Sequence, residues 1–206
     1  MKISLENAGK KYNREWVFRK LSTELSVNDS LAITGSNGSG KSTFLKMISG
    51  FESPTEGSIR YEDSRLIPLD KIYKQVTYTS PYIGIFEEYT MEELLKFYTA
   101  LKPLKPGIGV AEFIEIIELN HAQNKAIKYF SSGMKQRVKL GLSILSETPI
   151  LLLDEPTSNL DKKAIKWYQR IIQDHLNDRI VVVASNNLEE ESFFCTKSID
   201  IENYKP

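Results

Sequence analysis

The sequence predicts an α/β fold with a mostly parallel sheet, an N-terminal antiparallel β part and an inserted helical lobe. Three observations support this prediction. Residues 2–7, 21–27 and 57–61 are rich in strand-forming side chains, and the spacing of apolar residues becomes helical between residues 90 and 147. After residue 149, short and fully apolar runs alternate with amphipathic stretches, which is typical of a parallel sheet covered on both faces.

The order of the elements follows from local signals along the chain. The apolar run 31–34 predicts a buried strand, and residues 42–49 predict a helix that Gly50 ends. Thr90 and Glu93 form a capping box, so we expect the next helix to begin there. The remaining predicted elements are helices over 111–119 and 133–147, a strand over 150–153, a helix over 162–177 and a strand over 180–184.

Composition excludes several classes of protein. The 206 residues are 41% hydrophobic and 26% charged, as in globular proteins. The 27 basic and 27 acidic residues cancel, so a bulk positive field for nucleic acid is absent. The longest apolar stretches are far shorter than the ~20 residues of a membrane helix, so we expect no span. We predict one domain over 1–206, with a core from about 1–82 and 148–206 and a helical lobe over about 83–147.

A glycine-rich motif follows the predicted strand 31–34. Residues 35–43 match the pattern G-x-x-x-x-G-K-[ST], in which glycines let backbone N–H groups turn inward around a polyphosphate. Lys41 would reach the β- and γ-phosphates, and the Ser42 hydroxyl would bind Mg²⁺. A glycine-rich turn that matches by chance is the alternative, but a strand before the motif and a helix after it disfavour that reading. The predicted nucleotide-binding residues here are Ser36, Asn37, Gly38, Ser39, Gly40, Lys41, Ser42 and Thr43.

Two acidic residues end the predicted strand 150–153. Asp154 would lie at the carboxyl end of the strand, where ligands bind in open parallel sheets, and we expect it to hold Mg²⁺ with Ser42. Glu155 would point elsewhere and orient or deprotonate an attacking water. An acidic turn after a strand is common, so this signal alone is weak. Its occurrence together with the phosphate loop favours a catalytic pair.

With these motifs, nearly the whole chain resembles the nucleotide-binding subunits of ABC (ATP-binding cassette) transporters. Residues 35–43 resemble the phosphate loop of that family, and residues 130–137 resemble its LSGGQ signature. Residues 154–161 resemble its Walker B and D-loop segments, in the same order and at similar spacing. The resemblance implies a P-loop NTPase core and ATP as the nucleotide, hydrolysed with Mg²⁺.

The resemblance also implies how two subunits would share the nucleotide. Two such domains pair head to tail, either as two identical subunits or as two different ones, with ATP between the phosphate loop of one and the signature of the other. Tyr12 occupies the place where the family stacks an aromatic ring on adenine. Ser131 and Gly133 would present a hydroxyl and a backbone N–H to the γ-phosphate held by the partner. Asp161 would belong to the contact between the two subunits.

Three segments depart from the pattern of the family. Pro81 stands where the family has a glutamine that contacts Mg²⁺ and water, and the run 185–188 lacks the histidine that touches the γ-phosphate. The signature carries Ser132 and Met134 in place of a glycine and a glutamine. Asn186 can donate an amide hydrogen bond but cannot carry a proton. We therefore assign Glu155 and Asn186 as catalytic residues and expect slow hydrolysis.

The leading functional hypothesis is an ATP-binding subunit that couples ATP binding and hydrolysis to movement of a separate integral membrane permease. Such a subunit would be cytoplasmic and peripheral on the cytoplasmic face of the membrane. An apolar, aromatic stretch could receive the permease, although ordinary core packing explains it equally well. This stretch contains Tyr82, Ile83, Ile85, Phe86 and Tyr89.

Two other functions remain open. A soluble ABC-type protein that acts on ribosomes or nucleic acid is disfavoured by the zero net charge and by the single cassette, so no nucleic-acid partner is expected. A nucleotide-gated binding module with little or no hydrolysis is favoured by Pro81 and Asn186. Measuring phosphate release would separate this module from the transport subunit.

Overall fold

The computed structural model describes residues 1–186 and 189–206 and contains two compact units. Unit 1 consists of Met1–Tyr78, Thr148–Glu155 and Leu176–Pro206. Unit 2 consists of Thr79–Glu147 and Pro156–His175. Residues 156–175 thus group with the helices of unit 2, although the sequence suggested a place for them in the core. The division into one domain with a lobe over about 83–147 stays a prediction.

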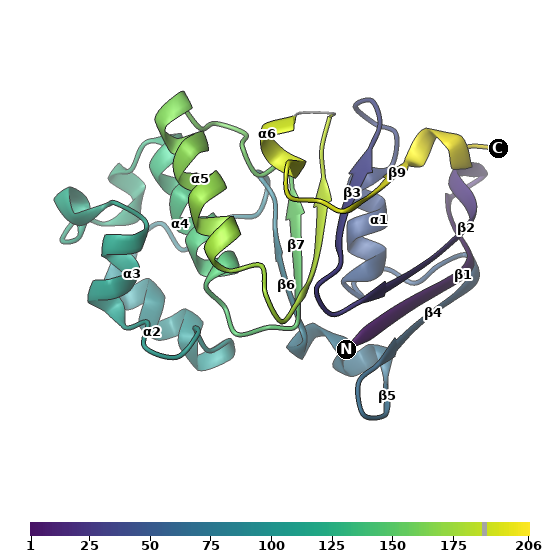
Figure 1. Ribbon diagram of the computed structural model, residues 1–206. Coiled ribbons are helices and arrows are strands. Elements are labelled where there is room, and N and C mark those ends of the chain that lie inside the picture. The colour runs from purple at the N-terminus through teal and green to yellow at the C-terminus, as the bar shows by residue number, and fades with distance from the viewer. Residues whose placement is uncertain (187–188) are drawn as a thin grey trace. The chain divides into compact units, whose positions relative to one another are not determined.

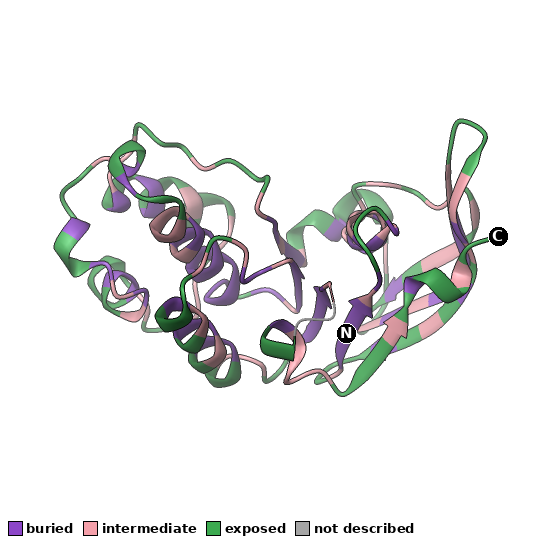
Figure 2. Cartoon of the chain, turned by 90° about the horizontal axis from the view of Figure 1, so that it is seen from above, coloured by how far each residue is buried: buried purple, intermediate pink, exposed green. Residues whose placement is uncertain are grey.

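The first sheet of unit 1 is antiparallel, as predicted (Figure 1). Its N-terminal strands are longer than the sequence suggested, because the polar segment 10–12 still pairs across the hairpin with residues 15–18. Its strands alternate between buried and exposed residues, which is visible beside the C-terminus in Figure 2. In spatial order the strands are β2 (Glu15–Ser26), β1 (Lys2–Tyr12), β4 (Glu56–Glu62) and β5 (Leu66–Ile67).

The second sheet contains the predicted parallel strands. Strand β3 pairs in parallel with β8 and β9, and β7 pairs in parallel with β8. Every residue of β7 and β8 is buried, in keeping with their apolar sequences. In spatial order the strands are β6 (Val76–Thr79), β7 (Ile150–Asp154), β8 (Ile180–Ala184), β3 (Ser30–Thr34) and β9 (Lys197–Asp200).

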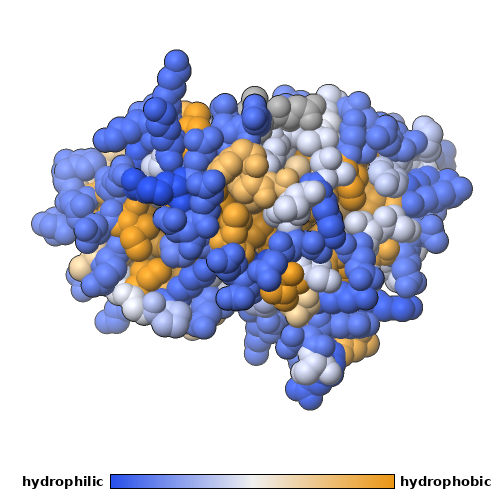
Figure 3. Space-filling view, in the orientation of Figure 1, coloured by the Kyte–Doolittle hydropathy of each residue, from blue (hydrophilic) through white to orange (hydrophobic). Residues whose placement is uncertain are grey.

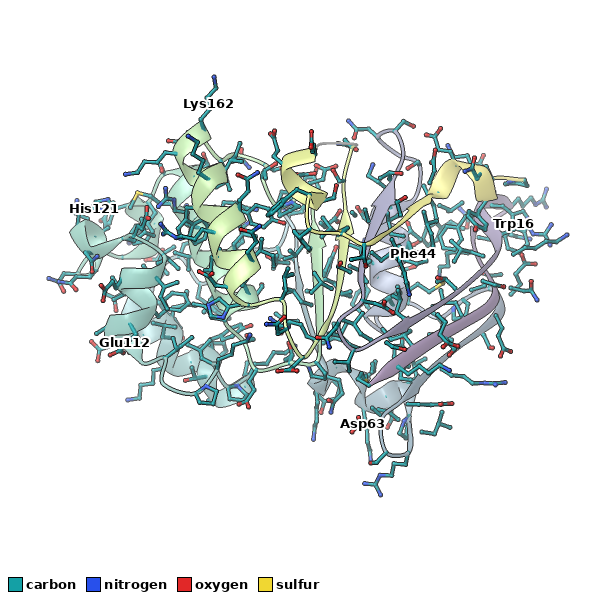
Figure 4. All side chains as sticks on the ribbon, viewed as in Figure 1. Trp16, Phe44, Asp63, Glu112, His121 and Lys162 are labelled. Carbon is teal, nitrogen blue, oxygen red and sulfur yellow. The ribbon has the colours of Figure 1, made fainter. Side chains whose placement is uncertain are left out.

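Helix α1 (Lys41–Ile48) joins the two sheets of unit 1 in one hydrophobic core. It contacts β7 and β8 on one side. On the other side the ring of Phe44 lies 6.1 Å from that of Phe18 on β2, in an edge-to-face arrangement; Figure 4 labels Phe44 in this interior. Gly50 follows the helix with φ 75° and its N–H donates to Met47 O, so the predicted glycine end of this helix is confirmed.

Unit 2 is mainly helical. The capping box at Thr90 is present, since Glu93 N donates to Thr90 Oγ1 and Thr90 N donates to Glu93 Oε2. Ser131 and Asp161 cap two further helices. Trp167 Nε1 donates to Ile116 O at 2.7 Å, which ties two of these helices together. The four helices are α2 (Met91–Leu101), α3 (Val110–Ile116), α4 (Ser132–Ile144) and α5 (Lys162–Asp174).

Three helices end earlier than predicted, two of them for a local reason. The helix expected to reach residue 119 stops at Ile116, because Glu118 adopts the left-handed φ of 56°. The helix expected to reach 147 stops at Ile144, since Ser146 leaves it to form a bridge with Leu104. The helix expected to reach 177 stops at Asp174.

Short segments complete the chain. They are helix α6 (Glu189–Ser192) and the 3₁₀ turns η1 (Leu69–Lys74), η2 (Asn120–Ala122), η3 (Ile127–Tyr129) and η4 (Ile201–Tyr204). On the face that Figure 3 shows, hydrophilic residues predominate and apolar residues form separate patches. Among the described residues, no helix combines the length and the apolar character that crossing a membrane requires.

Candidate active site

Three neighbouring strands of the parallel sheet lead into the predicted site residues. In the spatial order β7, β8, β3, the first ends at Asp154, the second is followed by Ser185 and Asn186, and the third is followed by the glycine-rich loop. The carboxyl ends of parallel strands lie at the same edge of a sheet, which is where open α/β sheets bind ligands. The fold of unit 1 therefore gathers segments that are far apart in the sequence.

The glycine-rich loop has a backbone that its glycines make possible. Gly35, Gly38 and Gly40 have φ angles of 142°, 77° and 112°. A Cβ on Gly40 would lie 2.4 Å from Val17 Cγ1, so a larger residue would clash as well as strain the backbone. Within the described chain no side chain caps α1, and the buried Ser39 Oγ has no hydrogen-bond partner. The loop thus offers donors that phosphate oxygens can satisfy.

Lys41 holds its ammonium group inside this loop. Its side chain is buried, and Nζ donates to Gly35 O and Ser36 O at 3.0 Å each. Nζ also donates to Asn186 Oδ1 at 2.5 Å. Among the described residues no carboxylate forms a direct ion pair with Lys41, and its positive charge acts through space on the carboxyl groups of Asp154 and Glu202, favouring their ionised forms. Such a charge beside the loop amides attracts an anion.

Asp154 combines burial with hydroxyl partners. Burial raises the pKa of its carboxyl group, and hydrogen bonds from the Ser42 and Tyr78 hydroxyls oppose this effect. The Tyr78 OH lies 3.0 Å from Asp154 Oδ2. A buried carboxylate next to a serine hydroxyl is a set of hard oxygen donors, which fits Mg²⁺. The described residues contain no cluster of three acidic, His or Cys ligands, and Mg²⁺ sites of this kind take their other ligands from phosphates and water.

Glu155 and Asn186 are in direct contact. Asn186 Nδ2 donates to Glu155 Oε1 at 3.1 Å, so the amide of Asn186 bridges Lys41 and Glu155. Glu155 has the left-handed φ of 45°, and its N–H donates to Ala184 O at 2.9 Å. Non-glycine residues in this region are strained, and such strain is concentrated at functional sites. The next two positions of the run 185–188, Asn187 and Leu188, lie outside the described residues.

Tyr12 lies beside the loop at the end of β1. Its hydroxyl forms hydrogen bonds with Thr43, which follows the loop lysine by two residues, and with Glu52. Burial, followed by the bond to Glu52, raises the pKa of Tyr12. Ser36 at the start of the loop donates through N and Oγ to Glu202 Oε1. The structure therefore brings Tyr12 and residues 36–43 together with Asp154, Glu155 and Asn186.

Ser131 and Gly133 belong to unit 2. Ser131 Oγ accepts a hydrogen bond from Met134 N, and a Cβ on Gly133 would lie 3.1 Å from Asn159 O. The N-terminus of α4 borders a hollow of about 480 Å³ that these residues line with Asn159 and Lys163. Ser131 is exposed there. The N–H groups of the first helical turn and the exposed hydroxyl suit an anion.

The sequence profile of the ABC transporter family matches residues 18–158 of the chain. The chain belongs to the ABC transporter family. Two curated members of this family illustrate its range. The cytochrome c biogenesis ATP-binding export protein CcmA of Rhizobium meliloti is 29% identical over 99% of both chains. The spermidine/putrescine import ATP-binding protein PotA of Clostridium acetobutylicum is 30% identical over 98% of this chain and 58% of its own length.

Solved structures of other ABC proteins share the fold. A Pyrococcus furiosus protein named as an ABC transporter ATP-binding protein has a TM-score of 0.85 with 22% identity, over the full length of both chains. A dimeric ATP-binding cassette, in a post-hydrolysis state bound to ADP and Pi, has a TM-score of 0.79 with 21% identity over 97% of this chain and 95% of that one. The predicted α/β fold is thereby confirmed for this ABC family member.

Four side-chain contacts, three within the site of unit 1 and one in unit 2, were not predicted. Tyr78 holds Asp154, Glu52 holds Tyr12, and Glu202 holds Ser36. In unit 2, Lys139 Nζ donates to Ser80 O and Pro81 O at 3.2 and 2.8 Å. The strand-forming residues 76–79 could have predicted strand β6, and with it a place for Tyr78 in the parallel sheet. The other three contacts join residues at least 40 positions apart, so no local pattern indicates them.

Proposed function

We propose that this ABC family member binds ATP and Mg²⁺ in unit 1 and hydrolyses the ATP to drive a separate membrane permease. The observation that carries this proposal is the Lys41–Asn186–Glu155 chain of hydrogen bonds at the carboxyl edge of the parallel sheet. It places the ammonium group of Lys41 and the carboxylate of Glu155 on either side of one amide. A triphosphate and its attacking water need these two groups close together.

The residues of the loop would bind and orient the triphosphate. The N–H groups at the start of α1 would donate to its oxygens, and Lys41 would exchange its bonds to Gly35 O and Ser36 O for phosphate oxygens. Asp154 and the Ser42 hydroxyl would hold Mg²⁺, which when bound neutralises charge on the phosphates. Tyr12 would stack on the adenine base.

Glu155 would orient the attacking water and accept its proton. The contact with Asn186 orients the Glu155 carboxylate, which would accept the proton of the water. The side-chain amide of Asn186 is neutral, so Asn186 would position Glu155 without supplying a proton. A clamp that binds ATP with little hydrolysis is the second candidate function. It is favoured by the hydrogen bond that Lys41 donates to Asn186, because that bond must be replaced when phosphate enters.

Replacing Asn186 separates these two functions. A hydrogen bond to a charged group contributes about 1.5–3 kcal/mol. We therefore expect Asn186→Ala to lower kcat for ATP about 10- to 100-fold while the protein still binds ATP. Asn186→Asp is the matched comparison. It keeps an oxygen that can accept from Lys41 Nζ, but it replaces the nitrogen that donates to Glu155 by an oxygen that repels the Glu155 carboxylate. Steady-state phosphate release measures the effect. An unchanged kcat in both variants would support the clamp instead.

We further propose that two subunits share the nucleotide. The exposed Ser131 hydroxyl and the N–H of Gly133 at the start of α4 would contact the γ-phosphate held by a second subunit. The first turn of α4 contains no acidic residue that would repel this phosphate. Asp161, which caps α5, would adjoin the same contact. The dimeric arrangement of the cassette bound to ADP and Pi supports the proposal by analogy of fold.

We propose that the permease docks on three aromatic rings of unit 2, namely Phe86, Tyr89 and Phe97, which we call the aromatic cluster. Phe86 lies 5.4 Å from Tyr89 and 4.9 Å from Phe97 between ring centroids. Phe86 is nevertheless 54% exposed, and the neighbouring Tyr82 is 89% exposed. Exposed aromatic rings in contact with one another are typical of protein interfaces. Docking there would place the chain at the cytoplasmic face of a membrane.

Serine substitutions in the aromatic cluster test the docking site. Interface aromatics often contribute 2 kcal/mol or more, so we expect Phe86→Ser with Tyr89→Ser to weaken permease binding by ~30-fold or more. Copurification from native membranes measures this loss. Tyr129→Ser is the matched control, because Tyr129 is an exposed aromatic of the same unit outside the cluster. Undiminished copurification of the double variant would exclude this docking site.

A further inference from the structure

Two charged side chains that the proposed mechanism does not use hold the ring of Tyr12. The Tyr12 OH donates a 2.5 Å hydrogen bond to Glu52 Oε2. The same oxygen lies 3.1 Å from Lys10 Nζ. Lys10 Nζ in turn lies 5.3 Å from the centroid of the Tyr12 ring, which is a cation–π distance. The three side chains therefore fix one another.

This group is shielded from water more than most surface ion pairs. The side chains of Lys10 and Glu52 are only 13% and 16% exposed. Lys10 Nζ has a further acceptor in Ser53 O at 2.9 Å. Burial by itself would raise the pKa of Glu52, but the hydrogen bonds from Tyr12 and Lys10 outweigh it and hold the pKa below its usual range. Glu52 is therefore ionised at neutral pH and keeps both partners.

Glu52 also connects the ring to the helix of the phosphate loop. The backbone N–H groups of Phe51 and Glu52 both donate to Lys46 O in the last turn of α1, at 3.1 and 3.2 Å. Helix α1 begins at Lys41. The orientation of the Tyr12 ring is thus set from the same helix that carries the lysine of the loop.

Tyr12 stays partly exposed although Lys10 contacts its ring. Lys10 Nζ lies over the ring, and the residue as a whole is 43% exposed. A planar base can stack only on a face that no other group covers. We propose that Lys10 and Glu52 are positioning residues that hold Tyr12 with the ring face opposite Lys10 toward the nucleotide base. The inference rests on the proposed ATP binding, and it explains how the site would gain affinity for the base of the nucleotide.

Comparing ATP with inorganic tripolyphosphate tests the inference, because only ATP has a base. Both dissociation constants are measured by calorimetry with Mg²⁺ present. Loss of a stacked aromatic typically weakens binding of a base about 5- to 150-fold, so we expect this range for ATP in Tyr12→Ala. Loss of one orienting hydrogen bond is smaller, and we expect Glu52→Ala to weaken ATP binding roughly 2- to 10-fold. Neither variant should change the affinity for tripolyphosphate.

Further variants show whether Glu52 acts through the ring. Tyr12→Phe keeps the ring but removes the hydroxyl that Glu52 binds. In that background Glu52→Ala should cause no further loss of ATP affinity, because the two positions are coupled. Glu52→Gln, which preserves the size of the side chain, provides the same comparison if Glu52→Ala lowers the melting temperature. Glu62→Ala, at an exposed position of β4, should leave both affinities unchanged.

Each outcome has a defined meaning. If Glu52→Ala and Glu52→Gln leave the ratio of ATP to tripolyphosphate affinity unchanged, Glu52 does not position the ring. An equal loss for both ligands would also overturn the inference, since it would mean an effect on the phosphate loop. If the unaltered protein binds neither ligand, the proposed function itself fails. Binding of tripolyphosphate with the same affinity as ATP would remove any role for Tyr12.

Discussion

Lys41→Ala is expected to weaken ATP binding by ~30-fold to several thousand-fold. Truncating one partner of a buried, hydrogen-bonded charge pair costs about 2–5 kcal/mol, and Lys41 is only 5% exposed. The variant removes the ammonium group that now donates to Gly35 O, Ser36 O and Asn186 Oδ1. Tripolyphosphate should lose affinity to the same extent, because the lysine acts on phosphate and not on the base. Calorimetric titration of both ligands measures the effect.

A second lysine controls for the loss of charge. Lys74→Ala removes a positive charge from an exposed position of unit 1 and should leave both affinities unchanged. Thermal unfolding of Lys41→Ala checks that the loop still folds. If the folded variant binds ATP as tightly as the unaltered protein, Lys41 does not contact the phosphates.

Glu155→Gln is expected to lower kcat for ATP hydrolysis by ~10²–10⁴-fold. General bases contribute effects of this size, and an amide cannot accept the proton of the water. The glutamine oxygen can still accept from Asn186 Nδ2, which now bonds Glu155 at 3.1 Å. ATP affinity should therefore be retained. Phosphate release and calorimetry measured on the same preparation separate the two effects.

A control variant and two contrary outcomes decide how a change in kcat is interpreted. Glu62→Gln, an exposed acid on β4, is the matched control and should hydrolyse ATP at the rate of the unaltered protein. A Glu155→Gln variant with undiminished kcat would show that another group activates the water. A fall in ATP affinity with no fall in kcat would assign Glu155 to binding rather than to catalysis.

The predictable part of the fold is the part that local sequence patterns determine. Strands β7 and β8 could be read from their sequences because every residue in them is buried and all except Asp154 are apolar. The start of α2 could be placed because the capping box at Thr90 lies within four residues of sequence. Strand β9 was missed because it is short and mostly exposed, so no apolar pattern marks it.

The limits of the site prediction have a similar cause. The loop residues 36–43, Asp154 and Glu155 belong to contiguous motifs, so their types and spacing were enough to predict them. The roles of their neighbours depend on contacts between distant segments. Asn186 meets Lys41 across 145 positions, and Tyr78 meets Asp154 across 76. Such contacts follow from the order of strands in the sheet, which the sequence alone did not specify.

Hydrogen exchange of the loop amides is the most direct test of the claim that a triphosphate binds in this loop. The measurement compares the free protein with the protein saturated with Mg²⁺ and a nonhydrolysable ATP analogue. We predict slower exchange for the segment that contains residues 36–43, and no such change in Lys41→Ala. Unchanged exchange in this segment at ligand concentrations that saturate binding would contradict the account, because the nucleotide would then bind elsewhere.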